Sequence, residues 1–572
     1  MDMISPIVTE NPRGLFVGYS NFGDVVREEL DFVDKTLFIQ EILDDAETQV
    51  VVITRPRRFG KTFNLSMLEH FLAPESGLLP TQGLFDGLKI SRLGEKYLQH
   101  QGKYPVIFIS FKDIKKDDYV SACESLRIQM AQVYMAHDYL LSSAALHDSD
   151  KDFFLTVLNR KASPAEINVS LNYLSRFLFK HTGVKPWLLM DEYDTPIQAG
   201  YLNGYYKEIV ATLRELFGRA LKDNTFLKRS VVTGILRVSK ESLFSGLNNV
   251  EMYSVLDQKY SEHFGFTQSE IDQLLAKKEL NHLSEKIRDW YNGYEFGTTT
   301  VYNPWSIVHC INKNGLLEPY WVNTSGNELI SNVLARSNEQ IKDDLESLIH
   351  GESITAIIEK HFVFNDLEKN KNTLWSLLLF SGYLKVTHIE PKEIRSQCEL
   401  TVPNKEIMAL YKTLTEDLLA APLGHGEYLD FLLSLTEGRV EEFTERLKKY
   451  LEETLGIFDT SGKEPEKFYH GFILGMMVSL NNTHEIKSNR ESGYGRYDVM
   501  LIPKDPEQLG IILEFKTVRD ETTDLEKAAQ QAMHQINNRH YEVELRQKGL
   551  QRILKMALAF RGKQVQVITD LA

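Results

Sequence analysis

The chain has 572 residues, which is too many for one hydrophobic core, and a prior of about 100–200 residues per domain predicts about three domains. Hydrophobic residues make up 42% and charged residues 25% of the sequence, as in ordinary soluble globular proteins. The net charge of −15 argues against a basic coat that would hold nucleic acid along the whole chain, and leaves a local basic groove open.

The cysteines and the N-terminal residues limit the class of protein further. Cys123, Cys310 and Cys398 form no CxxC pair, which argues against a disulfide framework or a zinc knuckle and favours reduced, buried thiols. The first residues lack a basic region followed by an apolar run, and no stretch reaches the ~18 apolar residues that a membrane helix needs. We therefore expect a soluble cytoplasmic protein with no membrane partner.

The first half of the chain alternates apolar runs with helical segments. Buried strands are predicted at residues 48–54, 105–111, 187–190 and 230–235. A helix is predicted over residues 62–72, where apolar residues recur at helical spacing. Strands that alternate with helices predict a parallel sheet with helices on both faces.

The segment RPRRFGKT (residues 55–62) lies between the first predicted strand and this helix, which is the context of a phosphate-binding loop. Lys61 would reach the β- and γ-phosphates, the Thr62 hydroxyl would bind Mg²⁺, and N–H groups at the helix N-terminus would hold the phosphates. Arg55 stands where the general motif GxxxxGK[ST] has its first glycine. The residues assigned to the nucleotide in this segment are Arg57, Arg58, Phe59, Gly60, Lys61 and Thr62.

The arginines of this segment have two interpretations. Arg55, Arg57 and Arg58 could form a nucleic-acid patch or a localisation signal. We favour loop cations near phosphate, or structural partners of acids.

Two carboxylates, Asp191 and Glu192, end the predicted strand at residues 187–190. Asp191 would hold Mg²⁺ directly or through water, and Glu192 would polarise the attacking water. The alternative is a buried strand that ends in solvated acids, but the GKT in the same predicted sheet favours catalysis.

Two residues at or after the end of another predicted strand, at 230–235, are further candidates. Thr233 could sense the γ-phosphate, and Arg237 could act as an arginine finger in cis or in trans. A plain strand end is the alternative for both.

The middle of the chain is predicted to be mainly helical. Aromatic-rich turns interrupt the helical pattern of residues 260–367. Residues 373–385 predict a helix that ends near Gly382, and short strands are expected around Val386 and at residues 400–402. A helix followed by a hairpin could be a winged-helix-like piece. Residues 428–451 predict a charged helical connector.

The α/β pattern returns at residue 465, with helices at 465–480 and 523–537 and strands near 496–502 and 510–515. Because side chains alternate along a strand, Glu514 and Lys516 share one face, and Asp498 reaches that face if the strands pair as a hairpin in register. Two carboxylates can hold one or two Mg²⁺ ions against a phosphodiester, and the lysine can orient or help deprotonate water. A buried carboxylate without a partner or a metal is costly, which favours a functional site over a structural one.

Four further polar residues flank this site. Glu466 and His470 lie one helical turn apart; Glu466 could be another metal ligand, whereas His470 is more typical of a core or supporting histidine. Gln535 and Tyr541 could contact a nucleic-acid backbone or support the lysine, or could be ordinary helix polarity and packing.

Short runs spread over nearly the whole chain resemble one known family. The chain is similar to the bacterial AAA-ATPase-like proteins that carry a C-terminal PD-(D/E)XK nuclease-family domain. The matching runs are FVDKT (32–36), TRPRRFGKT (54–62), MDEYDTP (190–196), TGILRVSKESLFSGLNN (233–249), YNPWSI (302–307), YWVNTSGN (320–327), LFSGYL (379–384), YHGF (469–472), SNRESGYGRYDVMLIP (488–503) and ILEFK (512–516).

The resemblance implies features that spacing alone does not. RPRRFGK[ST] looks like the family's normal phosphate loop, so Arg55 is less of an anomaly. FVDKT would lie near the nucleotide and could contact its base. Asp498, Glu514 and Lys516 would map onto the nuclease-type core. The family is often suspected of roles in mobile elements or defence. AAA-like ATPases often complete their site with a neighbour's arginine, so a homo-oligomer is an option.

We therefore expect an α/β multidomain protein: a P-loop NTPase sheet (1–255), a helical lid (256–335), a mainly helical connector that could be winged-helix-like (336–455), and a restriction-endonuclease-like α/β domain (456–572).

The expected function is ATP hydrolysis that controls a Mg²⁺-dependent nuclease acting on nucleic acid, with DNA favoured over RNA. The alternative is a nucleotide-switched regulatory or binding module whose nuclease-like domain does not cut. The expected cofactors are ATP with Mg²⁺ at the phosphate loop and Mg²⁺ or Mn²⁺ at the nuclease-like site. The predicted metal ligands are Thr62, Asp191, Asp498, Glu514 and Glu466.

Overall fold

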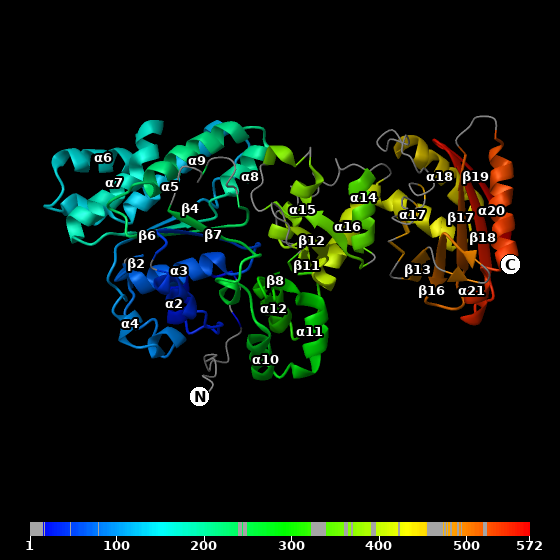
Figure 1. Ribbon diagram of the computed structural model, residues 1–572, viewed down its shortest axis with the longest axis horizontal. Coiled ribbons are helices and arrows are strands. Elements are labelled where there is room, and N and C mark those ends of the chain that lie inside the picture. The colour runs from blue at the N-terminus through cyan, green and yellow to red at the C-terminus, as the bar shows by residue number, and fades with distance from the viewer. Residues whose placement is uncertain are drawn as a thin grey trace. The chain divides into compact units, whose positions relative to one another are not determined.

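The computed structural model divides into two compact units, which are described separately (Figure 1). The first unit comprises residues 1–336 and 351–408, and the second comprises residues 337–350 and 409–572. The structure describes the chain except residues 1–14, 16–17, 46, 78, 238–242, 244–248, 322–338, 350, 360–363, 368–369, 391–395, 421–423, 455–468, 470–472, 474–475, 478, 481–482, 489–490, 493–494 and 519–522. The predicted boundaries at residues 255, 335 and 455 stay predictions.

A parallel five-stranded sheet forms the centre of the first unit, in the order β4-β5-β6-β1-β7. Its strands are β1 (Val50–Thr54), β4 (Val106–Ser110), β5 (Trp187–Asp191), β6 (Arg229–Gly234) and β7 (Val250–Tyr253). The four predicted strands are confirmed. The predicted strands do not include β7, because this four-residue edge strand is only half-buried and contains Glu251, so it lacks a continuous apolar run.

Helices cover both faces of this sheet, as the alternating pattern predicted (Figure 1). The face with α3 (Lys61–Leu72) also carries α2 (Leu37–Asp44), and the opposite face carries α5 (Tyr119–Met135), α7 (Pro164–Thr182) and α9 (Tyr206–Leu221). Shorter helices complete this part: α1 (Phe22–Arg27), α4 (Glu95–Leu98), α6 (Asp148–Leu158) and α8 (Thr195–Leu202). Burial on both faces leaves the strand ends as the place where polar side chains can gather.

A helical cluster with its own apolar core follows the sheet in sequence. It consists of α10 (Gln268–Lys277), α11 (Ser284–Tyr291), α12 (Pro304–Asn312) and the hairpin β8 (Tyr294–Phe296)–β9 (Thr299–Val301). The mainly helical prediction for residues 260–367 therefore holds for the described residues up to Trp321.

A small antiparallel sheet comes next, in the order β10-β12-β11. Its strands are β10 (Ile354–Ile357), β11 (Lys385–Glu390) and β12 (Gln397–Thr401), and α15 (Lys371–Phe380) precedes the β11–β12 pair. A helix followed by two paired strands is the winged-helix-like pattern that the sequence suggested. However, α15 is buried from Thr373 to Phe380, so it presents no free face to a nucleic-acid groove.

The second unit is built on a mixed sheet in the order β13-β16-β17-β18-β19. Only β17 and β18 are parallel; the other neighbours are antiparallel. Helix α20 (Leu525–Arg539) connects β17 to β18 and packs on one face, while α17 (His425–Thr436) and α18 (Val440–Thr454) lie on the other (Figure 1). The strands are β13 (His484–Ser488), β16 (Val499–Pro503), β17 (Gly510–Thr517), β18 (Ile553–Arg561) and β19 (Gln564–Leu571).

The remaining elements of this unit are short or connect its parts. They are α14 (Glu339–Ile349), α16 (Lys405–Ala420), α21 (Val543–Gln547), β14 (Glu491–Ser492) and β15 (Gly495–Arg496), and α16 begins in the first unit. Most of the helix predicted at residues 465–480 lies outside the described residues. The predicted strands do not include β13, β18 and β19. In β18, Lys, Met, Ala and Leu are helix-favouring residues, whereas β19 (QVQVITDL) carries an alternating, β-branched strand pattern that the prediction did not use.

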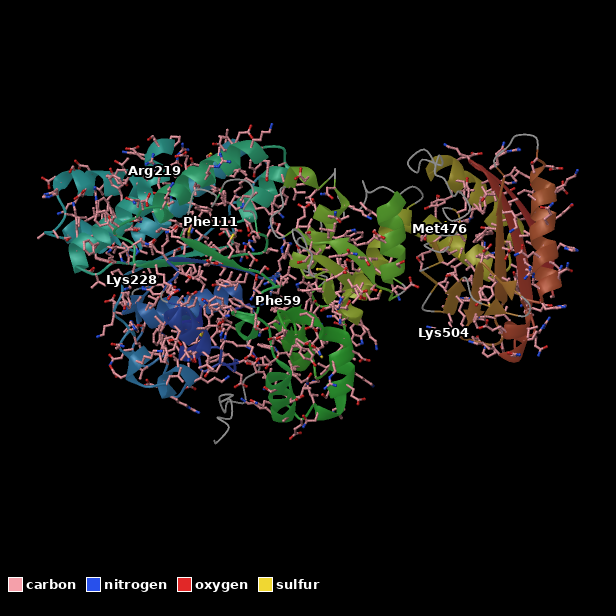
Figure 2. The ribbon with its side chains drawn as sticks, viewed as in Figure 1. Phe59, Phe111, Arg219, Lys228, Met476 and Lys504 are labelled. Atoms are coloured by element: carbon pink, nitrogen blue, oxygen red, sulfur yellow. The ribbon has the colours of Figure 1, made fainter. Side chains whose placement is uncertain are left out.

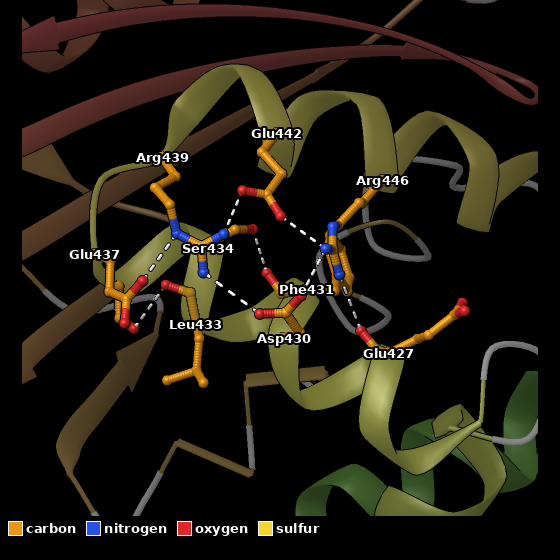
Figure 3. A network of polar contacts seen from close by, with 10 residues as sticks. Glu427, Asp430, Phe431, Leu433, Ser434, Glu437, Arg439, Glu442 and Arg446 are labelled. Atoms are coloured by element: carbon orange, nitrogen blue, oxygen red, sulfur yellow. Dashed lines mark hydrogen bonds and ion pairs between the residues drawn. The ribbon is translucent and has the colours of Figure 1, made fainter.

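Ion pairs of Asp430 join α17 to α18 (Figure 3). The Asp430 carboxylate lies 2.6 Å from the Arg446 guanidinium and 3.5 Å from that of Arg439, and Glu442 pairs with Arg446 within α18 at 2.7 Å. These exposed pairs contribute at most about 1 kcal/mol each. The buried side of the two helices, where aromatic rings stack against the sheet's apolar core, therefore contributes more to holding them together.

None of the helices in the described part of the chain combines the length and the apolar character that crossing a membrane would require.

Candidate functional sites

The phosphate loop, residues 55–60, leaves β1 and leads directly into α3. Gly60 has φ 84° and Arg58 has φ 66°, and these left-handed conformations turn the chain sharply before Lys61 begins the helix. The Lys61 ammonium donates to the carbonyls of Arg55 at 3.0 Å and Pro56 at 2.8 Å. Burial lowers the pKa of Lys61, and the charges of Glu192 and Asp191 oppose that shift. The lysine therefore lies between the loop and the acids that end β5.

Asp191 lies at the centre of this site, because it binds one residue in the first turn of α3 and one near the end of β6. Its Oδ2 accepts from the Thr62 hydroxyl at 2.6 Å, and its Oδ1 accepts from the Thr233 hydroxyl at 2.5 Å. This juxtaposition follows from the sheet order, since β6, which ends near Thr233, lies between β1 and β5. A hydroxyl and a carboxylate oxygen in contact are the hard ligands that suit Mg²⁺.

Glu192 follows Asp191 in a strained conformation, with φ 50°. Its Oε2 accepts from the Thr195 hydroxyl at 3.3 Å. Burial raises the pKa of Glu192, while the positive charges of Lys61 and Lys112 act in the opposite direction. A half-buried carboxylate with a raised pKa is suited to polarise a water molecule or to accept its proton.

Two loop arginines reach neighbouring elements. Arg57 donates to the Gln198 side-chain carbonyl at 3.2 Å, and the Gln198 amide donates to Asp194 Oδ2 at 2.9 Å. Asp194 is fully buried and also accepts from the backbone N–H groups that follow β6. The Arg58 guanidinium lies 4.1 Å above the centre of the Trp305 ring. Gln198, Asp194 and Trp305 were not predicted as site residues, because each is positioned by tertiary contacts.

Phe59, predicted as a nucleotide residue, turns its ring away from solvent. Phe59, whose position is labelled in Figure 2, is 1% exposed. Its ring centroid lies 4.9 Å from that of Tyr294 and 5.2 Å from that of Phe296, both on β8. A contribution of Phe59 to phosphate binding would therefore come from its backbone N–H.

Arg55 has a structural environment that explains why glycine is absent at the first motif position. Its guanidinium is fully buried and donates to the carbonyls of Thr54 at 2.8 Å, Tyr253 at 3.3 Å and Lys259 at 3.3 Å. It also lies over the Phe296 ring at 5.0 Å. Burial lowers the pKa of Arg55 to about 9. Arg55 is therefore a structural residue, but its hydrogen-bond partners are backbone carbonyls and not the acids that the sequence interpretation named.

Replacing Arg55 by glycine, which restores the general motif, is expected to destabilise the first unit by about 3 kcal/mol or more, because carbonyls lose buried donors and a cavity forms. Calorimetric or denaturant unfolding measures this loss. The matched control is Arg127→Ala, which removes a surface pair with Glu124 and should cost at most about 1 kcal/mol. An Arg55→Gly protein that is as stable as the wild type would contradict the structural role.

Arg237 and the FVDKT segment were assigned less direct roles. Arg237 lies just after β6, and burial lowers its pKa, while the negative charges of Asp257 and Glu251 oppose that shift. Its role as an arginine finger stays a prediction.

The FVDKT segment lies close to the start of α3. Its Phe32 ring lies 6.2 Å from the ring of Phe63, which follows Thr62 in sequence, and its buried Lys35 donates to Glu270 at 2.6 Å. The segment thus lies beside the first turn of α3; a contact with the base stays a prediction.

In the second unit, the β16–β17 pairing brings the three predicted residues together. Val499 pairs with Leu513, so Asp498 lies beside Glu514 at the end of the ladder. Asp498 Oδ2 accepts from the Phe515 backbone N–H at 2.7 Å, and Lys516 Nζ lies 3.9 Å from Glu514 Oε1. The Glu514 carboxylate is 2% exposed, whereas Lys516 is 30% exposed. The register on which the prediction depended is therefore present.

Gln535 and Tyr541 contact this site through Glu514. The Gln535 amide donates to Glu514 Oε1 and to the Tyr541 hydroxyl, the latter at 3.2 Å. Burial raises the pKa of Tyr541, and the charges of Glu514 and Asp498 add to that shift. These contacts favour a supporting role over ordinary helix polarity, and the group that Gln535 supports is the Glu514 carboxylate.

The two carboxylates supply hard oxygen ligands that fit Mg²⁺ or Mn²⁺. Glu466, predicted as a third ligand, and His470 lie outside the described residues. Over the part of the chain that the structure describes, no group of three or more His, Cys, Asp or Glu side chains is arranged to hold a metal ion. Asp498 and Glu514 would thus form a metal site together with water, substrate oxygens or further ligands.

Comparisons with known proteins agree with the two folds. Residues 16–244 match the family described as predicted AAA-ATPase, and residues 464–570 match the PD-(D/E)XK nuclease superfamily. The chain is 26% identical over 410 residues to an uncharacterized protein in the vnfD 5′ region of Azotobacter chroococcum mcd 1, and the alignment covers 71% of this chain and 70% of that protein. The first match contains the phosphate loop with Asp191, and the second contains Asp498, Glu514 and Lys516. The chain therefore joins an AAA-ATPase-like domain to a PD-(D/E)XK nuclease-superfamily domain.

Proposed function

We propose that the protein binds and hydrolyses ATP at the phosphate loop, and that the nucleotide state controls a Mg²⁺- or Mn²⁺-dependent nuclease site at Asp498, Glu514 and Lys516. The observation that supports it most is the presence of two separate constellations in one chain: Asp191 bound to Thr62 and Thr233, and Asp498 aligned with Glu514. The substrate would be nucleic acid, with DNA favoured over RNA. The setting would be bacterial cytoplasm, in mobile-element or defence biology.

At the phosphate loop, each side chain has a distinct task. Lys61 would exchange its loop carbonyls for phosphate oxygens, and Thr62 and Asp191 would hold the ion. Bound Mg²⁺ would offset the charge on the β- and γ-phosphates. Glu192 would orient the attacking water and accept its proton, and Thr233 keeps Asp191 in position.

At the nuclease-like site, Asp498 and Glu514 would hold the ion, and Lys516 would orient the attacking water and stabilise charge on the phosphate. A bound divalent ion would polarise the phosphodiester. Gln535 fixes one oxygen of Glu514, which leaves the orientation of that carboxylate defined.

The test is a cleavage screen of purified protein on single- and double-stranded DNA and RNA, with Mg²⁺ or Mn²⁺, with and without ATP. Wild-type protein should cut at least one substrate, and ATP should change the rate. The Lys61→Ala variant should cut at a rate that ATP no longer changes. If no nucleic acid is cut under any condition while ATP is hydrolysed, the nuclease part is wrong and a non-cleaving, nucleotide-switched binding module takes its place.

Gln198 is proposed as a positioning residue for Arg57, which would contact the terminal phosphate. Arg57 raises the positive potential at Lys61, so the two cations lie close together. Gln198→Ala should lower kcat for ATP about ten-fold, the effect of about 1.4 kcal/mol, with little change in KM. Steady-state ATPase kinetics measures this, with the exposed Gln132→Ala on α5 as control. An unchanged kcat in Gln198→Ala would remove Gln198 from the site.

A further inference from the structure

Trp321 bonds the phosphate loop with its side chain and a buried carboxylate with its backbone. The indole N–H donates to the Arg57 carbonyl at 3.1 Å. The Trp321 backbone N–H donates to Glu406 Oε1 at 2.7 Å. Arg57 lies 264 residues before Trp321 in the sequence, and Glu406 lies 85 residues after it. One residue thus connects the loop that would hold phosphate to the first turn of α16.

Glu406 is held tightly at this position. The residue is fully buried, and both carboxylate oxygens accept from the Ser306 hydroxyl, at 3.0 and 2.8 Å. Burial raises the pKa of Glu406 to about 7, so the neutral acid is well populated near neutral pH. Asn404 caps the same turn, because its Oδ1 accepts from the Ile407 N–H at 3.1 Å. The start of α16 is therefore fixed by buried polar contacts.

The phosphate loop packs closely against residues around Trp321, so a movement of the loop would also move these neighbours. A Cβ on Gly382 would lie 2.9 Å from the Pro56 Cβ, so the backbone there packs directly on the loop. The Trp321 ring lies 5.0 Å from the Tyr383 ring. Arg58 lies over Trp305, which neighbours Ser306 on α12. Three of the runs that carried the family resemblance, YNPWSI, YWVNTSGN and LFSGYL, thus supply residues that pack against the phosphate loop.

Helix α16 is the element through which a signal could leave the first unit. It runs from Lys405 to Ala420, and the first unit ends at Met408 while the second resumes at Ala409. A change in the orientation of the Arg57 carbonyl would strengthen or weaken the Trp321 bond, and one such bond is worth about 1 kcal/mol. That is enough for a measurable coupling between two sites.

We propose that the Trp321–Glu406 link, meaning the bonds from the Arg57 carbonyl through Trp321 to Glu406, transmits the nucleotide state of the phosphate loop to the first turns of α16. The inference rests on the proposed function, because it requires nucleotide at the loop. It adds the route by which the ATPase domain regulates the chain that continues into the nuclease-like unit.

The test is hydrogen exchange of the α16 amides in the full-length protein, measured by mass spectrometry without nucleotide and with saturating non-hydrolysable ATP analogue and Mg²⁺. Occupancy is checked in each variant by titration with a fluorescent ATP analogue. In the wild type, nucleotide should change α16 exchange about five-fold, which corresponds to about 1 kcal/mol. This readout does not depend on cleavage of nucleic acid.

The variants separate transmission from a merely structural role. Trp321→Phe removes the indole donor and keeps a ring against Tyr383, and Glu406→Ala removes the acceptor. Glu406→Gln keeps an acceptor for Trp321 and an amide for Ser306, so it should restore the response. Trp290→Phe, a similar change at a partly buried tryptophan of α11, is the control. The response should vanish in the first two variants and persist in the other two.

Three results would overturn the proposed link, and they differ in what they imply for the nucleotide site. An α16 response that persists in nucleotide-bound Trp321→Phe and Glu406→Ala would overturn the link. A wild-type protein that binds nucleotide without any α16 response would overturn the link and leave the nucleotide site standing. A wild-type protein that binds no nucleotide would overturn the proposed function, and the link with it.

Discussion

Lys61→Ala is expected to lower ATP turnover by about 10²–10³-fold, the range for removing one preorganised group that stabilises transition-state charge. Lys61 is buried and bonds the carbonyls of Arg55 and Pro56, so no surface cation can replace it at the loop. The measurement is phosphate release by purified protein under saturating ATP and Mg²⁺, with ATP binding measured in parallel.

The control for this variant is Lys161→Ala, which removes an exposed lysine of the same unit and should leave turnover unchanged. Glu192→Gln should also abolish turnover but retain ATP binding, because the amide cannot accept a proton from water. Turnover that survives Lys61→Ala would mean that hydrolysis occurs elsewhere or that the loop is only a scaffold.

Lys516→Ala is expected to lower the rate of nucleic-acid cleavage by about 10²–10⁴-fold, the range for one group in proton transfer at a reacting centre. The ammonium lies 3.9 Å from Glu514 and is partly exposed, so it can reach a phosphodiester. The ATPase rate should stay unchanged, because the lysine belongs to a different domain. Cleavage of labelled DNA and RNA in Mg²⁺ or Mn²⁺ measures the loss.

Glu514→Gln extends this test to the metal. The amide supplies a weaker ligand than the carboxylate, so the concentration of Mn²⁺ needed for half-maximal cleavage should rise. The control is Lys527→Ala, which removes an exposed lysine from α20 in the same unit. Equal cleavage by wild type and Lys516→Ala would show that the observed cutting does not come from this site.

Local patterns allowed much of the first unit to be predicted. The strand–loop–helix order around Lys61 and the two acids after β5 are short segments whose chemistry is contained in a few consecutive residues. The same holds for the alternation that places Glu514 and Lys516 on one face of β17. In the two five-stranded sheets, the strands that escaped prediction are β7, β13, β18 and β19. The edge strand β7 is only half-buried and β18 is rich in helix-favouring residues, whereas the alternating β-branched residues of β19 are a strand signal that the prediction did not use.

Other site features could not be read from local sequence. In sequence, Arg55 is a departure from the general motif; in the structure its guanidinium is buried among carbonyls of β1, β7 and the segment after β7. Phe59 looked like a nucleotide residue until its ring was found packed against β8. In each case the deciding partner is about 200 residues or more away along the chain, and no spacing rule relates the two.

Motif and strand periodicity are enough to identify the residues that could carry chemistry, namely Lys61, Asp191, Asp498, Glu514 and Lys516. Which of them meet, and which neighbours support them, depends on the tertiary fold. The sheet order places Thr233 against Asp191, and the hairpin register places Asp498 beside Glu514. Trp321 joins the phosphate loop to Glu406 in the same way. The physical reason is that hydrogen bonds between distant segments depend on how strands and helices pack. Periodicity shows which face of a segment is buried, but it does not show which distant segment packs against that face.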